Sequence, residues 1–152
     1  MDNADLRRLL CNSARLRLLD VRGCGSVTAD GLLRLPADNL QHLFLSRSGA
    51  TAGCGALYPL LERWRHSLLE LDLAGGGHQP TVDAALRQLA APDTERWPPP
   101  PLRRLDLCGA AGSLPAVQLG WPPVRELDLS SCRGLKRLYS GAGDEVATLR
   151  DG

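Results

Sequence analysis

The sequence predicts an α/β solenoid in the form of a partial horseshoe, with about five short parallel strands on its concave face and short helices and irregular loops on its convex face. Leucine is far more frequent than in an average protein, and a short leucine-containing phrase returns along the whole chain. Segments with helical periodicity lie between some of these phrases. Recurrence at a spacing of this size is typical of solenoids, in which each repeat packs on its neighbours.

The repeated phrase is Leu-x-x-Leu-x-Leu, with valine replacing leucine at two places. It begins at residues 16, 40, 68, 102 and 124, so the spacings are 24, 28, 34 and 22 residues. Three of the spacings fall in the range of roughly 20–29 residues that is typical of leucine-rich repeats. The longest spacing contains residues 91–101, with Trp97 and four consecutive prolines. We interpret this segment as a proline-rich loop inserted between the third and fourth repeats.

The alternation within each phrase places leucines on one face of a short strand and the intervening residues on the other. Stacked repeats would bury these leucines in one continuous column, although no repeat is stable alone. We therefore predict a single leucine-rich-repeat domain over residues 1–152. Its parts are the returning helix of a truncated repeat (1–15) and repeats at 16–39, 40–67, 68–101, 102–123 and 124–152.

Between strands the chain must return along the convex side. Thr81–Leu89 is the clearest predicted helix, because Thr81 is a suitable N-cap and apolar residues follow at helical spacing. Leu57–Trp64 is a second predicted helix, with Pro59 in its first turn, and Val27–Leu35 is a shorter third. The segment Ser113–Val117 is too short for a helix, so we expect irregular structure there.

Bulk properties narrow the class of function. The 152 residues are 43% hydrophobic and 23% charged, with a net charge of +1, so no strong field would attract nucleic acid. Met1–Leu10 lacks the apolar run of a signal peptide or membrane anchor. The five cysteines are widely spaced without a Cys-x-x-Cys pair, which argues against a disulfide framework and a zinc site. We expect a cytoplasmic or nuclear protein without nucleic-acid or membrane partners.

Enzyme motifs are missing from the sequence. His42, His66 and His78 lie outside any recognised nucleophile motif, and no phosphate-binding Gly-x-x-x-x-Gly-Lys is present. Gly75-Gly76-Gly77 follows a predicted strand but does not continue as a dinucleotide-binding fingerprint. We therefore expect a non-catalytic chain without cofactors or metals.

A family resemblance follows from the first repeat. Leu16 to Cys24 reads Leu-x-x-Leu-x-Val-x-x-Cys and is followed by Val27-Thr28, which resembles the cysteine-containing leucine-rich repeats of F-box proteins. The closing segment from Ser131 through Tyr139 to Val146 is also similar to that family. The resemblance implies the substrate-recognition region of a receptor subunit in a cullin (SCF) ubiquitin ligase. A Skp-family adaptor and the cullin would bind through an F-box, which this sequence does not contain.

The predicted partner-binding residues are those that face outward from the strands. This concave grid holds Leu18, Asp20, Arg22, His42, Phe44, Ser46, Glu70, Asp72, Ala74, Arg104, Asp106, Cys108, Glu126, Asp128 and Ser130. Adjacent ionised aspartates about 4.8 Å apart would repel by about 3–4 kcal/mol at an effective dielectric of 20. We expect Arg104 and a basic segment of a protein substrate to offset that repulsion. The alternative is that these carboxylates are simply solvated.

Individual residues on or near this grid leave alternatives open. Phe44 is the only phenylalanine, and it is a candidate anchor for a partner or a residue that packs under the following loop. Cys24 and Cys132 lie where the repeat turns, so we expect structural roles there. Cys108 falls on the outward grid as an accessible thiol without evident activation.

Two other functional interpretations remain open. The chain could be a leucine-rich-repeat scaffold or inhibitor unrelated to ubiquitination, a choice that an F-box upstream of Met1 would settle. It could also be a truncated product, in which the first strand at 16–21 leaves an apolar edge that favours self-association.

Overall fold

The computed structural model describes residues 1–52, 57–75, 101–109, 116–119, 125–128, 137–140 and 145–148. The helices are α1 (Asn3–Leu10), α2 (Ala29–Leu33), the 3-10 helix η1 (Gly49–Thr51) and α3 (Leu57–Trp64). The strands are β1 (Leu18–Asp20), β2 (His42–Phe44), β3 (Glu70–Asp72), β4 (Arg104–Asp106), β5 (Ala116–Leu119), β6 (Glu126–Asp128), β7 (Arg137–Ser140) and β8 (Glu145–Thr148).

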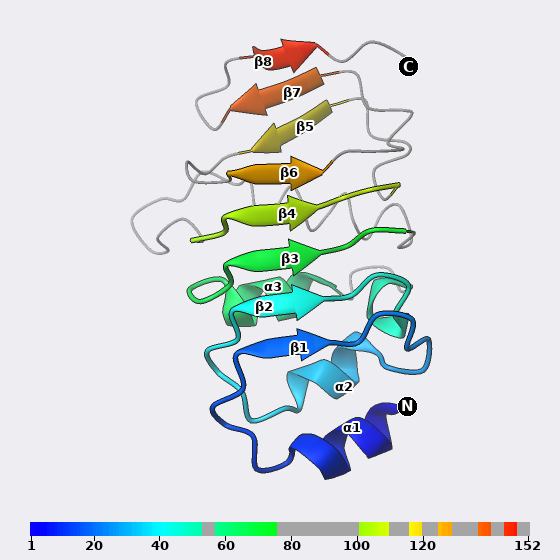
Figure 1. Cartoon of the computed structure of the whole chain (residues 1–152). Coiled ribbons are helices and arrows are strands. Elements are labelled where there is room, and N and C mark those ends of the chain that lie inside the picture. The colour runs from blue at the N-terminus through cyan, green and yellow to red at the C-terminus, as the bar shows by residue number, and fades with distance from the viewer. Residues whose placement is uncertain are drawn as a thin grey trace.

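One strand from each leucine phrase joins a five-stranded parallel sheet, in the order β1-β2-β3-β4-β6 (Figure 1). The prediction of about five short parallel strands is therefore confirmed. The chain is α/β, because short helices connect the first strands of this sheet. Direct register continues from strand to strand, so equivalent residues of successive phrases lie side by side.

A row of leucines forms the centre of the core. Leu19, Leu43, Leu71, Leu105 and Leu127 are direct register partners along the sheet. The first four are at most 6% exposed, and Leu127 packs against the same cluster while partly buried. Burying one leucine side chain stabilises a fold by about 1.5–3 kcal/mol. The shared row therefore explains why the phrase needs an apolar residue at this position in every repeat.

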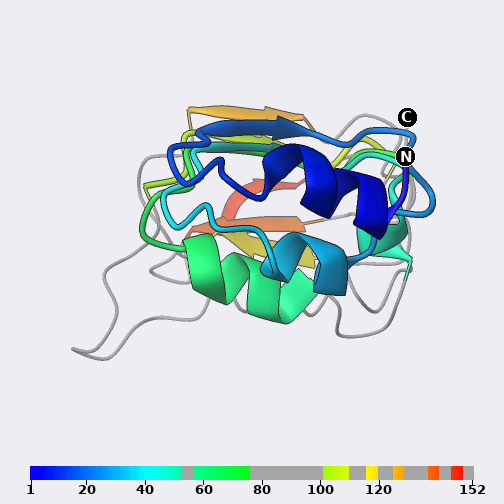
Figure 2. The same ribbon diagram turned by 90° about the horizontal axis from the view of Figure 1, so that it is seen from below.

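The helices cover one face of the sheet. Seen from below, α2 and α3 lie opposite the strands, across the core from them (Figure 2). The predicted helix Leu57–Trp64 is confirmed with the same bounds, whereas α2 covers only Ala29–Leu33 of the segment predicted as helical. Thr28 caps α2, because its side chain accepts a hydrogen bond from the Gly31 N–H. No helix in the described part of the chain has the length and apolar character needed to span a membrane.

Helix α1 confirms the expectation of a helix within residues 1–15. Asp2 and Asp5 form a capping box at its start, and the basic residues of α1 lie in its last turn. Leu6 is 2% exposed and belongs to the core cluster. Helix α1 therefore packs on the core beside α2 and β1, where it covers part of that end of the leucine column (Figure 2).

The turns after the first four strands of the five-stranded sheet share one unusual backbone conformation. Gly23, Gly75 and Gly109 have positive φ angles of 73°, 74° and 69°, and Arg47 has a φ of 55°. Each of these residues lies four positions after the central leucine of its strand. Glycine adopts this left-handed conformation readily, whereas a residue with a Cβ is disfavoured there. Successive repeats therefore share the geometry of this turn as well as the register of their strands.

Two expectations about the later repeats need correction. Ser113–Val117 was expected to be irregular, but β5 begins at Ala116 and pairs with β7. In addition, β7 and β8 pair antiparallel within the interval predicted as the last repeat. Local periodicity misses both features because β5 is only four residues long and its partner comes much later in the chain. The predicted helix Thr81–Leu89 and the insertion loop 91–101, apart from Pro101, lie outside the described residues.

Candidate protein-binding face

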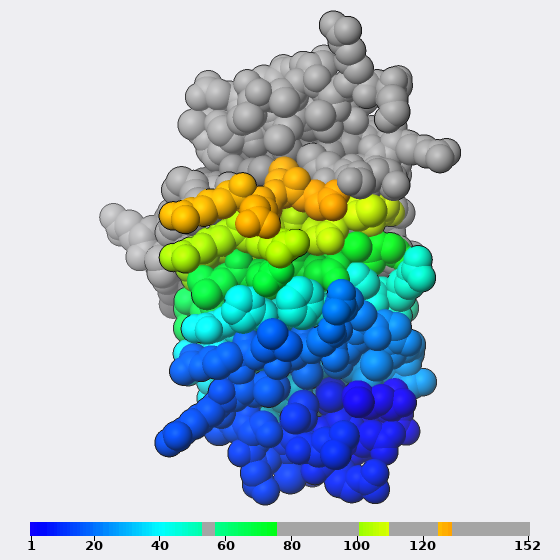
Figure 3. All heavy atoms as spheres, in the orientation of Figure 1, coloured from blue at the N-terminus to red at the C-terminus, as the bar shows by residue number. Residues whose placement is uncertain are grey.

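The residues beside the leucine row form the outer face of the five-stranded sheet, which is turned away from the helices. Its first row is Leu18, His42, Glu70, Arg104 and Glu126, and its second row is Asp20, Phe44, Asp72, Asp106 and Asp128. Figure 3 views this face, on which β1, β2, β3, β4 and β6 form successive bands. The structure thus aligns the partner-binding residues predicted on the strands, with Arg22 just beyond β1.

From β2 to β6, basic and acidic side chains alternate along the first row. The Nδ1 atom of His42 lies 3.0 Å from Glu70 Oε2. Arg104 then bridges two carboxylates, with Nη1 3.4 Å from Glu70 Oε1 and Nε 3.3 Å from Glu126 Oε2. We expected Arg104 to offset repulsion between the aspartates, whereas the ion pairs of Arg104 join the two glutamates of the first row. Both Arg104 and Glu126 are more than half exposed, so each pair contributes at most about 1 kcal/mol.

Three aspartates of the second row, on β1, β3 and β4, accept hydrogen bonds from the turns that follow their strands. These bonds run from Arg22 N to Asp20 Oδ1 (3.1 Å), from Ala74 N to Asp72 Oδ1 (2.8 Å) and from Cys108 N to Asp106 Oδ1 (2.9 Å). A carboxylate that bonds to the backbone two residues further on is the usual Asx-turn arrangement. The Leu-Asp-Leu phrase therefore stabilises the turn in addition to carrying charge.

Asp72 corrects the expectation of a solvated carboxylate. It lies in the predicted row, but the residue is only 6% exposed. The Ser46 hydroxyl donates to both of its oxygens, at 2.7 and 2.8 Å. Strand alternation places Asp72 on the outer face, whereas its burial depends on a serine from the preceding repeat. Charge reversal at Asp72 would therefore break buried hydrogen bonds and would not test partner binding alone.

Phe44 is half-buried beneath an arginine. The guanidinium carbon of Arg22 lies 5.2 Å from the centre of the Phe44 ring, within the range of a cation–π contact. The same guanidinium donates to Asp20, with its shortest bond at 2.6 Å. This side-chain hydrogen bond from Arg22 lowers the pKa of Asp20 below its ordinary value. Arg22 therefore links the first two strands on the outer face.

The remaining residues of the predicted grid and the turn cysteines are placed only in part. Cys24 packs against the core and its Sγ atom lies 3.8 Å from the Arg22 carbonyl oxygen, in line with a structural role. Cys108 is half-buried, not openly exposed. Ser130 and Cys132 lie outside the described residues.

A hollow of about 670 Å³ lies on the outer face over β4 and β6. Its charged lining consists of Asp106, Glu126 and Asp128 together with Arg104 and Arg125. Three carboxylates therefore face two guanidinium groups, one of which already bridges Glu70 and Glu126. The hollow suits a basic side chain of a bound segment better than an acidic one.

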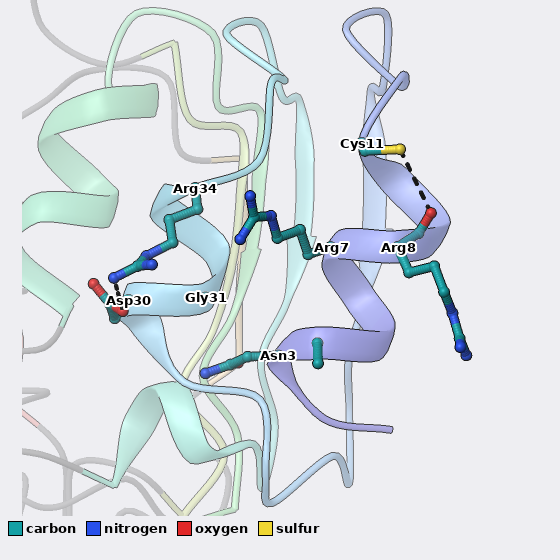
Figure 4. A pocket seen from close by; sticks show the side chains of 8 residues that line it. Asn3, Arg7, Arg8, Cys11, Asp30, Gly31 and Arg34 are labelled. Atoms are coloured by element: carbon teal, nitrogen blue, oxygen red, sulfur yellow. Dashed lines mark hydrogen bonds and ion pairs between the residues drawn. The ribbon is translucent and has the colours of Figure 1, made fainter.

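A second concavity, which sequence reasoning missed, lies between α1 and α2 and has a volume of about 500 Å³. Figure 4 shows Arg7 reaching toward α2, whereas Arg8 points away from the groove. Arg34 is paired with Asp30 at 3.0 Å. The sequence could have indicated the pair of Asp30 and Arg34, because side chains four residues apart on a helix are neighbours. The groove itself depends on how α1 and α2 pack.

We also searched the described residues for a metal site and for the surroundings of the histidines. In the part of the chain that the structure describes, no group of three or more His, Cys, Asp or Glu side chains is placed to hold a metal ion. His42 contacts Glu70, and His66 contacts Asn39 at 3.3 Å, while His78 lies outside the described residues. Comparisons with protein-family models, curated proteins and solved structures find no match to this chain.

Proposed function

We propose that the chain is part of a leucine-rich-repeat solenoid whose outer face binds a protein substrate. Three features support the solenoid: the five phrases in direct register, the buried leucine row and the equivalent turn after each of four strands. A solenoid of this kind presents an extended surface that needs no closed pocket. Protein binding also requires no cofactor and no catalytic residue.

The observation that carries this proposal is the continuity of the charged outer face. Direct register sets ten strand residues in two rows across five strands. Contacts between neighbouring strands run along the first row, from His42 to Glu70 and from Arg104 to both Glu70 and Glu126. The acidic hollow over β4 and β6 lies within this face and favours a substrate with a basic segment.

We further propose that this region chooses the substrate for an F-box receptor of an SCF cullin ubiquitin ligase. The support is the cysteine-containing repeat from Leu16 to Cys24 with the following Val27-Thr28. In such a receptor the adaptor and the cullin bind through the F-box, whereas the substrate binds to the repeats. The working compartment would be the cytoplasm or the nucleus.

Charge removal on the outer face tests the proposal. In cells, the full-length gene product that carries this region would be purified as wild type and as the double variant Asp106→Asn, Glu126→Gln. A partner that binds the hollow should be recovered about tenfold less with the double variant, which corresponds to about 1.4 kcal/mol. Glu62→Gln is the matched control, because Glu62 is exposed on α3 at the opposite side of the sheet.

The outcomes separate the candidate functions. Co-purification of a Skp-family adaptor together with a charge-dependent partner supports the receptor. A charge-dependent partner without adaptor or cullin favours a scaffold or inhibitor. If no co-purifying protein depends on Asp106 and Glu126, or if Glu62→Gln has the same effect, the outer face is not the binding surface.

A further inference from the structure

Arg47 occupies a turn position that glycine occupies in three other repeats. Its φ angle is 55°, whereas the equivalent Gly23, Gly75 and Gly109 have φ angles of 69–74°. A non-glycine residue in this left-handed region is disfavoured by contact between its Cβ and the backbone. Backbone strain of this kind persists where the surrounding structure or a function maintains it.

Among the described residues, Arg47 makes no hydrogen bond or ion pair that would explain this choice. Gly23 N donates to Ser46 O at 2.9 Å, and Gly75 N donates to Cys108 O at 2.7 Å. Within the described residues, neither the backbone N–H nor the guanidinium of Arg47 has such a partner. Arg47 therefore lacks the conformational freedom of glycine, and no described residue forms a hydrogen bond with it at this turn.

The side chain of Arg47 lies along the next turn and remains exposed. Its Nε atom lies 3.2 Å from the position that a Cβ on Gly75 would occupy. The adjacent Ser46 already directs its hydroxyl to Asp72, and Arg22 is already paired with Asp20. In contrast to Arg22, Arg47 has no ion pair with a carboxylate among the described residues.

We infer that Arg47 is a recognition residue whose guanidinium binds a carboxylate on an acidic segment of the partner protein. The segment lies along the turns after β2 and β3, beside the outer face. This inference rests on the proposed function and adds to it the chemistry of one part of the partner. Guanidinium and carboxylate groups form paired, charge-assisted hydrogen bonds, which a glycine at this turn could not supply.

The first test asks whether Arg47 is strained and without a structural role. Thermal unfolding of the 152-residue chain would be compared between wild type, Arg47→Gly and Arg47→Ala. Arg47→Gly should raise the midpoint by about 2–4 °C, whereas Arg47→Ala retains the strain and should leave the midpoint near that of wild type. A lower midpoint for Arg47→Gly would show that Arg47 stabilises the fold and would overturn the inference.

The second test measures carboxylate binding by NMR. Acetylated hexaglutamate would be titrated into the chain while the Arg47 Nε–Hε and Gly75 N–H signals are followed. Both signals should shift, and the Gly75 shift should be lost in Arg47→Ala but partly kept in Arg47→Lys. Hexalysine, and the variant Arg15→Ala at another exposed arginine, are the controls. Equal shifts with hexalysine, or an unchanged Gly75 shift in Arg47→Ala, would overturn the inference.

This measurement uses the isolated chain and a defined peptide, so it does not depend on capturing a substrate. Loss of the hexaglutamate response in Arg47→Ala, with substrate capture unaffected by Asp106→Asn and Glu126→Gln, would contradict the proposed function alone. A capture result that depends on Asp106 and Glu126, with no hexaglutamate response at Arg47, would contradict this inference alone.

Discussion

The side chain of Asn3 occupies the space that a Cβ atom on Gly31 would need. Asn3 also exchanges two hydrogen bonds with Thr28, from Nδ2 to Thr28 Oγ1 at 2.8 Å and from Thr28 N to Oδ1 at 2.9 Å. This contact sets how closely α1 approaches the first turn of α2. It joins two segments that are 25 residues apart in the sequence.

Gly31→Ala should therefore destabilise the chain by about 1–3 kcal/mol, because the new methyl group must displace Asn3 and break its bonds to Thr28. Urea unfolding measures the change. Gly25→Ala is the control and should have an effect within about 0.5 kcal/mol, since a Cβ there meets no atom within 4 Å. In the double variant Asn3→Ala, Gly31→Ala, the two effects should be less than additive. Full additivity would show that the contact does not couple the helices.

Arg63 should be more important for stability than its position at the edge of α3 suggests. Its guanidinium donates to the carbonyl oxygens of Leu33 and Leu35, the latter at 2.6 Å, and contacts Asp38. Leu33 is the last residue of α2 and Leu35 lies two residues beyond it, where carbonyl oxygens lack helical partners. Arg63→Met should reduce the free energy of unfolding by about 2 kcal/mol. Glu62→Ala, at the exposed neighbour, should change it by less than about 0.5 kcal/mol in the same denaturation experiment.

Asp106 should combine a structural role with a charge role, and two substitutions separate them. Asp106→Asn keeps an oxygen that can accept the bond from the Cys108 N–H, so its stability should match wild type while its charge is lost. Asp106→Ala removes the bond as well and should cost about 1 kcal/mol. Unfolding curves of the two variants provide the comparison. Equal losses would mean that the Asx turn contributes nothing measurable.

The Asp20–Arg22 pair should make a pH-dependent contribution. The folded-state pKa of Asp20 is lowered from 3.8 by its hydrogen bond to Arg22, so the ionised form favours the fold. That contribution is present above pH 3.8 and is lost as the pH falls through the lower folded-state pKa. Carboxyl-carbon NMR should show the pKa of Asp20 rising in Arg22→Ala. Arg17→Ala should leave it low, because Arg17 bonds to Asn39 O.

The strands could be predicted from the sequence because alternation is a local property. A buried leucine at every second position suffices to place Leu43 inward and His42 and Phe44 outward, and the structure has them so. The helix Leu57–Trp64 follows from the same kind of local period. The burial of Asp72 was not predictable in this way, since it requires Ser46, which belongs to the preceding repeat.

By itself, the sequence determined where the five strands of the parallel sheet lie and which of their side chains point inward, because strand periodicity needs only neighbouring residues. Tertiary structure alone decided that Arg104 bridges Glu70 and Glu126, that Arg22 covers Phe44 and that Asn3 fits against Gly31. These contacts join residues from different repeats. Their geometry depends on the register between strands and on how helices pack across the core, which no single repeat encodes.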